Sequence, residues 1–363
     1  MKQPAIRCPI QSAIHPGADH ANAQAVLWME AFFLCSNETE RVRLAHSGCG
    51  RLAGHIVPEA TIESLQIVAD FFTWNVAFDD EYCDEGPLGK RPGDLAAVLS
   101  MLLRTLETPE TPIFGSDRYA TAMRDIRCRL DQIAEPWQTR LWVESMRGWF
   151  LAETWKSGNV AAKRMPSLNE YATLRLYSGG ALVFPVLALI VENQTVSCAE
   201  LEQRPVRALT EMAATLCTWV ADIVSYEKEM QREIGGHNLI NVIEHEQQCS
   251  VVQAISYAVA LYDEIMRLFL CLKTHLEQQA SAGLQQYLTS LAHLVRSSVD
   301  WCHASERYNA SLSWEVSTTG SELQQEATAE GSCAKSMIPS IAWWWEYNPA
   351  PARLPLSSAP SSL

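Results

Sequence analysis

A dense run of carboxylates is the sharpest chemical feature of the sequence. Its members lie within seven residues, directly before a Gly-Pro stop: Asp79, Asp80, Glu81, Asp84 and Glu85. At the end of a helix such charges repel one another and also meet the negative end of the helix dipole. The run is either a solvated helix end or a site that divalent cations neutralise. Magnesium suits such a site, because it takes one or two protein carboxylates and completes its octahedron with water and phosphate oxygens.

The residues before this run decide what a metal site there would face. On a helix, Val76, Asn75 and Phe72 stand at i−3, i−4 and i−7 from Asp79 and therefore share its face. The whole stretch FFTWNVAF is strongly apolar. A metal site at its end would open onto a largely apolar cavity.

A second polar stripe occurs further along the chain, in a strongly helical pattern. Ser225 and Glu229 are four residues apart and share a helix face, and Asp222 is rotated by about 60° from Ser225. A hydroxyl and a carboxylate one turn apart can hold a hard cation, although the same pattern also describes an ordinary exposed face. Lys228 and Arg232, again four apart, would place positive charge beside the stripe.

Segments with a helical period of apolar residues must position these groups. The pattern predicts helices at 23–33, 62–83, 95–106, 120–133, 138–157, 167–178, 209–232, 251–279 and 284–308. Turn signals such as Val57-Pro58, Gly86-Pro87 and Gly235-Gly236 separate them. Alternating strand patterns are scarce and no linker splits the chain, so we expect one all-α domain.

We expect this domain to span 21–320. A partly flexible N-terminal segment, 1–20, precedes it, and a C-terminal extension, 321–363, follows it. The extension ends in PAPARLPLSSAPSSL after Asn348, a composition typical of disorder.

Composition excludes several classes of function. The formal charge of −14 argues against nucleic acid or an anionic membrane as the main partner. The N-terminus lacks the continuous apolar region of a secretory signal, and no uncharged apolar stretch reaches the ~18 residues of a spanning helix. The eleven cysteines, an odd number without CxxC spacing, are typical of reduced core residues. We expect a cytoplasmic globular protein without membrane insertion.

Together the two polar motifs resemble those of class I terpene synthases of the bacterial and fungal type. That family carries an aspartate-rich motif, DDxxD or DDxxx(D/E), and later a second metal motif, NDxxSxxxE. Asp79-Asp80-(x3)-Asp84 matches the first. Ala221-Asp222-(x2)-Ser225-(x3)-Glu229 matches the second at every named position but one, and Lys228 and His237-Asn238-Leu239 match its usual continuation.

Three further marks of the family fall at the expected distances. Its pyrophosphate-sensing Arg stands 46 residues before the second metal motif, as Arg175 stands before Ala221. Ser178 and Gly179 occupy the linker and effector positions of the helix break expected after that sensor. Arg307-Tyr308 matches an Arg-Tyr pair near the end of the family's domain. The resemblance runs from about residue 20 to about residue 315.

The resemblance implies a class I terpenoid synthase-like helical bundle around a central apolar cavity. It implies three Mg²⁺ ions when the diphosphate is bound. Asp79, with Asp80 or Asp84, would hold two of them. Ser225 and Glu229 would hold the third, with Asp222 as a further ligand candidate.

Residues implied to bind the diphosphate directly are Arg175, Lys228, Arg307 and Tyr308, with Arg232 as a further candidate. Gly179 would present its carbonyl to the cavity, whose walls would include Asn75, Val76 and Ser178. Phe72 and Trp301 would stabilise a carbocation with their aromatic faces, or else are ordinary core residues.

The implied reaction is ionisation of a prenyl diphosphate and cyclisation of the carbocation to a terpene hydrocarbon or alcohol, with release of diphosphate. Farnesyl diphosphate is the family's commonest substrate, and geranylgeranyl diphosphate comes next. We expect a monomer or homodimer whose partner is this small molecule. A chain-elongating prenyltransferase of the same fold would need a second DDxxD motif, which the sequence lacks.

One departure from the family pattern bears on activity. The first ligand of the second metal motif, normally Asn or Asp, is Ala221, and a methyl group cannot coordinate a metal. Asp222 substitutes for it, water fills the position, or the third ion binds weakly. The alternative function is therefore a catalytically impaired paralogue that binds prenyl diphosphates without turnover.

Overall fold

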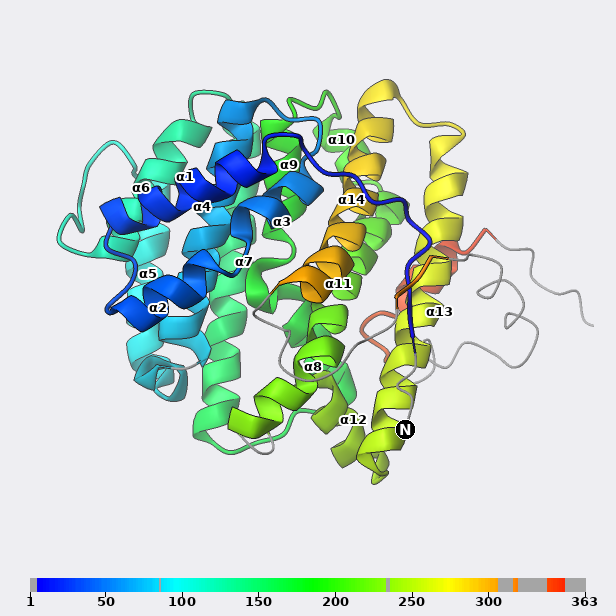
Figure 1. Ribbon diagram of the computed structural model, residues 1–363. Helices are drawn as coiled ribbons and strands as arrows, with labels where there is room; N and C mark the ends of the chain where they lie inside the picture. Colours follow the sequence, from blue (N-terminus) through cyan, green and yellow to red (C-terminus); the bar gives the residue numbers. More distant parts are fainter. Residues whose placement is uncertain (1–4, 85, 233–235, 306–315, 319–337, 350–363) are drawn as a thin grey trace, which may run out of the picture.

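The computed structural model describes residues 5–84, 86–232, 236–305, 316–318 and 338–349. It is built almost entirely of helices (Figure 1), in the order α1 (Ala18–Ala31), α2 (Glu38–Ala45), α3 (Cys49–Ile56), α4 (Ile62–Phe78), η1 (Asp79–Asp84), η2 (Pro87–Lys90), α5 (Pro92–Glu107), α6 (Arg118–Leu130), α7 (Pro136–Ala161), α8 (Leu168–Tyr177), η3 (Ser178–Gly180), α9 (Val183–Val191), α10 (Cys198–Leu201), α11 (Arg204–Arg232), α12 (Leu239–Gln247), α13 (Val251–Glu277), α14 (Ala282–Ala304) and η5 (Ala342–Tyr347). Two short strands, β1 (Ile6–Arg7) and β2 (Val316–Ser317), pair in parallel. The expected all-α fold class is confirmed.

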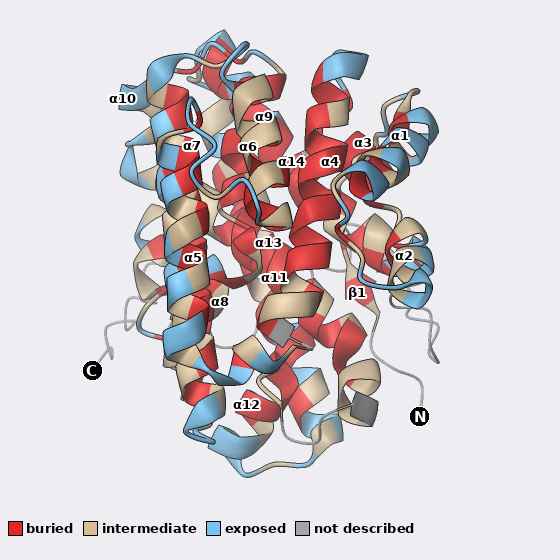
Figure 2. Cartoon of the chain, turned by 90° about the vertical axis from the view of Figure 1, so that its left-hand side faces the viewer, coloured by how far each residue is buried: buried red, intermediate tan, exposed pale blue. Residues whose placement is uncertain are grey.

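Helix α4 is the centre of the bundle. From Ser64 to Phe78 every residue except Gln66 is buried, on all sides of the helix. A helix that is apolar all round belongs in a core. Thr61 begins it, because its hydroxyl accepts a hydrogen bond from the backbone N–H of Ser64. Figure 2 shows α4 among the buried helices together with α11 and α14, whereas α5 and α7 turn exposed residues outward.

The neighbours of α4 form two groups that meet around it. Helices α1, α3, α6 and α9 pack on α4, and α13 and α14 pack on α11. Helix α14 also contacts α3 and α9, which joins the two groups. The faces of α4 and α11 that carry the two polar motifs are therefore held in one helical body.

The apolar segment that comprises α8 and α9 is broken between these two helices, at η3. Ser167 and Glu170 form a capping box that begins α8. Gly179 and Gly180 both have positive φ, 76° and 77°, a conformation that glycine adopts without steric cost. The break allows α8 to pack on α7 and α11 while α9 packs on α7, α14 and α4.

Segments near both chain ends are tied to the bundle. At the N-terminal side Ile6 is buried and Arg7 forms an ion pair of 2.8 Å with Asp263 of α13. At the other end the indole N–H of buried Trp344 donates to Glu211 of α11 over 2.9 Å. The backbone N–H of Ser340 donates to the Asn169 amide oxygen at the start of α8. This segment thus links α8 to α11.

One described segment, Leu168–Val191, is long and apolar enough to cross a membrane by length and composition alone. However, 72% of its most apolar window is buried inside the fold, which is also typical of a core helix in a globular protein.

The ten cysteines that the structure describes are all free.

Each of the nine helices expected from apolar periodicity has a counterpart in the structure. Helix α4 stops at Phe78, however, and the acidic run winds on as the π-helical η1 rather than as α-helix. Helices α2 and α3 were not expected, because eight residues are too few to establish a period. Helix α9 was also missed, because it is buried on every side and therefore shows no polar face.

Candidate active site

A cavity lies between the carboxyl end of α4 and the middle of α11. Its walls come from α3, α4, η1, α8, η3, α9, α11 and α14, and consist of Leu52, Ile56, Phe72, Asn75, Val76, Asp79, Arg175, Gly179, Ala181, Phe184, Cys217, Thr218, Ala221, Leu294, Ser298, Trp301 and Cys302. The sequence-predicted residues of α4 therefore lie around the same space as the predicted sensor and the first position of the second motif. Apart from Asp79 and Arg175, none of the described residues in the walls carries a charged side chain.

The acids of the first motif differ in their partners. The carboxylate of Asp80 lies 3.2 Å from the guanidinium of Arg43 on α2. Glu81 accepts from Arg118 over 2.5 Å and from the Tyr119 hydroxyl over 2.7 Å. Of this motif, Asp79 is the acid that contributes to the cavity wall.

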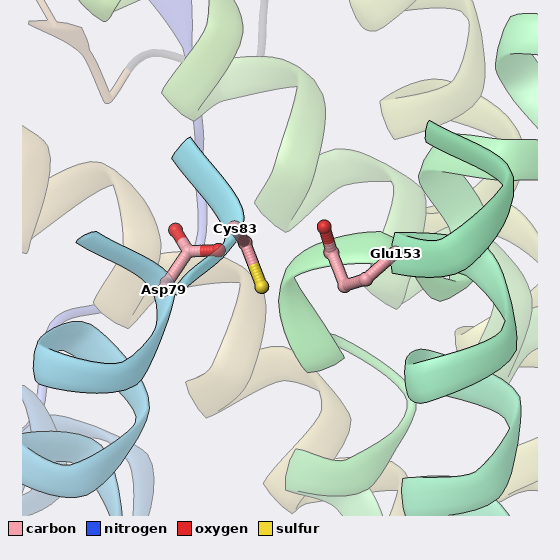
Figure 3. Close-up of side chains that lie close together, drawn as sticks. All are labelled: Asp79, Cys83 and Glu153. Carbon is pink, nitrogen blue, oxygen red and sulfur yellow. The ribbon is translucent and has the colours of Figure 1, made fainter. Parts of the chain in front are cut away.

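Asp79 lies in a small cluster with Cys83 and Glu153 (Figure 3). Their ligand atoms all fall within 4.8 Å of one another, and the side chains from η1 and α7 point toward the same space. Glu153 is 1% exposed and already carries several donors: the indole N–H of Trp149, the backbone N–H of Gly179 and the ammonium of Lys156. A thiol is also a poor ligand for a hard cation. The cluster therefore joins the acidic motif to the helix break rather than forming a separate metal centre.

The helix break is fixed from two sides. Glu153 accepts from the backbone N–H of Gly179 over 3.0 Å. A Cβ at Gly179 would stand 3.0 Å from Nη1 of Arg175, in addition to the strain of its positive φ. Arg175 also donates weakly to the carbonyl and hydroxyl oxygens of buried Ser178, at 3.4 and 3.5 Å. The break thus lies against both the sensor position and the acidic motif.

Arg175, on the cavity wall, is held by Asp222 of α11. Its Nη2 atom lies 2.8 Å from Oδ1 of Asp222, and its Nε–H donates to the same oxygen over 3.0 Å. The Tyr171 hydroxyl donates to the other oxygen, Oδ2, over 2.6 Å. Burial alone would lower the pKa of the Arg175 guanidinium, but the charge of Asp222 raises it above its usual value. Burial, and next the charge of Asp222, raise the pKa of Tyr171, which keeps it a neutral donor.

The second motif forms its own network one turn further along α11. The Ser225 hydroxyl donates to Oε1 of Glu229, and the side-chain amide of Asn238 donates to Oε2 over 3.0 Å. The same Asn238 amide donates to the backbone oxygen of Asp222 over 2.9 Å, and its oxygen caps α12 at Ile240. Ala221 contributes to the cavity wall at the first position of the motif.

Aromatic residues form part of the cavity wall. Phe72 is 2% exposed, and its ring centroid lies 4.7 Å from that of Phe184. Trp301 lines the wall while its indole N–H donates to the backbone oxygen of Ser47 over 2.7 Å. Both predicted aromatic residues therefore face the cavity.

Some predicted residues lie elsewhere or outside the described part of the chain. Lys228 is half-buried on α11 and is not part of the cavity wall. The wall also does not include five other predicted residues: Asp80, Ser178, Asp222, Ser225 and Glu229. Arg307 and Tyr308 fall outside the described residues, as do the side chains of Asp84 and Arg232.

Sequence reasoning missed the partners that position these groups: Arg43, Glu153, Tyr171 and Arg118. Each lies on a helix other than that of its partner acid or glycine, so no local spacing connects the two. Asn238 is different. The sequence marks it as part of the continuation His237-Asn238-Leu239, but does not predict its contacts with Asp222 and Glu229.

The arrangement places oxygen ligands for a hard cation on two helices of one body. Carboxylate and hydroxyl oxygens at Asp79, Ser225 and Glu229 are the donors that Mg²⁺ takes. The guanidinium of Arg175 supplies positive charge on the cavity wall, in a fork that suits phosphate. The chemistry on offer is therefore binding of an anion with metal at the mouth of an apolar cavity.

Comparisons with known proteins agree with this geometry. The profile of the family described as "Terpene synthase family 2, C-terminal metal binding" matches residues 70–267. A germacradien-6-ol synthase of Streptomyces pratensis is 31% identical over 95% of this chain and 96% of that protein. A T-muurolol synthase of Streptomyces clavuligerus, described as farnesyl diphosphate cyclizing, is 32% identical over 93% of this chain and 81% of its own length. The crystal structure of an ancestral reconstruction, SVS_A2, superposes with a TM-score of 0.82 at 30% identity, covering 95% of this chain and 99% of that one.

The contacts of Asp222 give a testable prediction for the protein without metal. Asp222→Asn should lower the free energy of unfolding by about 3 kcal/mol, because it removes the counter-charge of Arg175, whose side chain is only 20% exposed. Urea denaturation in the presence of a chelator measures this. The control is Glu144→Gln, which breaks an ion pair with Arg147 whose acid is 63% exposed and should shift the midpoint far less. If the stability of Asp222→Asn is unchanged, the pairing role is contradicted. Asp222 would then again be a candidate metal ligand.

Proposed function

The chain belongs to terpene synthase family 2, and on that premise we propose that it is a Mg²⁺-dependent class I cyclase of farnesyl diphosphate. One observation carries the proposal: Asp79, Arg175 and the second motif's first position line a single cavity, and the other described residues of its walls are uncharged. An anionic head group and a hydrocarbon tail are both accommodated by such a site. The catalytic domain is assigned to 21–320.

The substrate class is supported by the relatives. The T-muurolol synthase of Streptomyces clavuligerus and the 4-epi-cubebol synthase of Streptosporangium roseum are both described as farnesyl diphosphate cyclizing. We therefore favour the C15 substrate and place the C20 diphosphate second.

Metal ligation is assigned to both polar motifs. Asp79, with Asp80 or Asp84, would hold two Mg²⁺ ions, and Ser225 with Glu229 would hold a third. When bound, the ions stabilise the negative charge that develops on the departing diphosphate. Asn238 would keep Glu229 aimed at the cavity through the 3.0 Å hydrogen bond to its carboxylate.

The diphosphate would be bound by Arg175, Lys228, Arg307 and Tyr308, with Arg232 as a further candidate. Arg175 is already oriented by Asp222, so its fork is preorganised for the developing charge. This pairing favours Asp222 as a positioning residue rather than as the substitute for the ligand missing at Ala221.

The hydrocarbon chain would lie deeper, against the aromatic wall. Ionisation breaks the allylic C–O bond and leaves a carbocation that water must not capture at random. Phe72 and Trp301 offer ring faces that stabilise a desolvated cation by up to about 2 kcal/mol each. The uncharged walls keep bulk water away while the rings close.

Ala221 favours one alternative function. If its methyl group leaves the third ion too weakly held, the protein would bind prenyl diphosphates without turnover. That alternative and the cyclase differ in a single measurable property, turnover in the presence of Mg²⁺.

The proposal predicts cyclic terpene products from one of three substrates. Purified protein with Mg²⁺ is incubated with the C10, C15 and C20 diphosphates, and the extract is analysed by gas chromatography and mass spectrometry. We expect products from the C15 substrate, and a loss of at least 100-fold in kcat/KM for Asp79→Ala, equivalent to about 2.7 kcal/mol. Binding of the diphosphates without product would establish the alternative, and wild-type rates in Asp79→Ala would overturn the metal assignment.

A second prediction concerns Ala221. Positions 221, 225 and 229 are spaced i, i+4 and i+8 and drift by only about 40° per step, so an amide at 221 could reach the cation of Ser225 and Glu229. Ala221→Asn should therefore lower the Mg²⁺ concentration needed for half-maximal activity. Magnesium titrations of the wild type, Ala221→Asn and the size control Ala221→Leu decide this. A midpoint that does not move in Ala221→Asn would mean that water or another ligand completes the site.

A further inference from the structure

Most polar groups on the inner wall of the cavity are satisfied by the protein itself. The hydroxyl of Thr218 donates to the backbone oxygens of Ala214 and Thr215, and the hydroxyl of Ser298 donates to that of Leu294. The indole N–H of Trp301 donates to the Ser47 oxygen. These groups need nothing from a ligand.

Asn75 is different. It is 8% exposed, and its Nδ2 atom is buried without a hydrogen-bond partner among the described residues. Other buried polar atoms in the described part of the chain share that condition, but Asn75 alone among them belongs to a residue of the cavity wall. A buried amide is normally hydrogen-bonded, so this one points to a partner that is not protein.

The surroundings of the amide explain why the protein does not satisfy it. Nδ2 lies 3.4 Å from where a Cβ of Gly180 would stand, so the bare Cα of the helix break packs against it. The two ends of an amide exchange by a half-turn about χ2, and either end can hold a water molecule, as donor or as acceptor. Thr218 lines the same cavity. Its hydroxyl donates its hydrogen to the backbone, but its oxygen can still accept a hydrogen bond from a ligand.

The position of Asn75 fixes where such a water would act. It stands one helical turn before Asp79 on the same face of α4, hence deeper than the metal motif, and Phe72 follows almost a turn deeper still. The hydrocarbon part of a prenyl substrate has no hydrogen-bonding group to offer an amide. At this depth, between the ionisation end and the aromatic wall, water is the ligand that fits.

We propose that Asn75 holds a water molecule that captures the cyclised carbocation, so that the main product is a terpene alcohol. This inference rests on the proposed cyclase function. The water oxygen donates an electron pair to the cationic carbon and forms the C–O bond. The resulting oxonium loses one proton to an oxygen of the released diphosphate, and no oxidant or reductant is required. Asn75 is thus a specificity-determining residue.

The test is the product spectrum of the wild type and of Asn75→Leu in water enriched in ¹⁸O. The wild type should give mainly an alcohol that carries the label. In Asn75→Leu, a substitution of similar shape without the amide, the ratio of alcohol to hydrocarbon should fall at least tenfold. Asn75→Ala removes the amide without adding atoms and should show the same fall, should the Leu variant not fold.

Asn159→Leu is the matched control. Asn159 is also a buried asparagine whose Nδ2 atom lacks a partner in the described structure, but it lies on α7 away from the cavity wall. Its substitution should leave the product ratio unchanged. Unlabelled or purely hydrocarbon products from the wild type, or an unchanged ratio in both Asn75 variants, would overturn the role of Asn75 alone. The absence of any product from the wild type would overturn the cyclase function as well.

Discussion

A buried carboxylate must be paired, and the pairing of Asp222 with the partly buried guanidinium of Arg175 is the interaction on which the site depends. It connects α8 to α11 through a contact of 2.8 Å, with the Tyr171 hydroxyl completing the carboxylate. Because the cost of an unpaired buried charge is several kcal/mol, this contact fixes the spacing between the two helices. The contact therefore also positions the helix break at Gly179, which directly follows α8, and the second polar motif, which lies on α11.

The acidic end of α4 is organised by the opposite constraint, an excess of like charge. Arg43 and Arg118 each compensate one carboxylate, at Asp80 and Glu81. Asp79 instead faces the cavity, near Glu153, whose own charge is balanced by Lys156 and two N–H donors. The negative potential is thereby concentrated at the cavity mouth, where divalent cations would relieve it.

The sequence predicts the fold class well because most helices here are amphipathic and long enough to show a period. It also predicts that Asp79, Asn75 and Phe72 share the cavity, since this follows from helical spacing alone. Other predicted residues, among them Ser225 and Glu229, are not part of the cavity wall. It could not reveal that Glu153 of α7 holds Gly179, or that Tyr171 and Arg175 converge on Asp222, because these contacts join separate helices. The π-helical turn of η1 likewise depends on packing against η2 and on the partners of its acids rather than on local propensity.

The central claim is that the two polar motifs, on α4–η1 and on α11, bind one metal–diphosphate complex jointly. The most direct measurement is the thermal unfolding midpoint with inorganic diphosphate, with and without Mg²⁺, for the wild type, Asp79→Ala and Glu229→Ala. At saturating concentrations the account predicts a rise of about 5 °C or more only when both are present, and its loss in either variant. An equal rise with diphosphate alone, or a full rise in either variant, would contradict it.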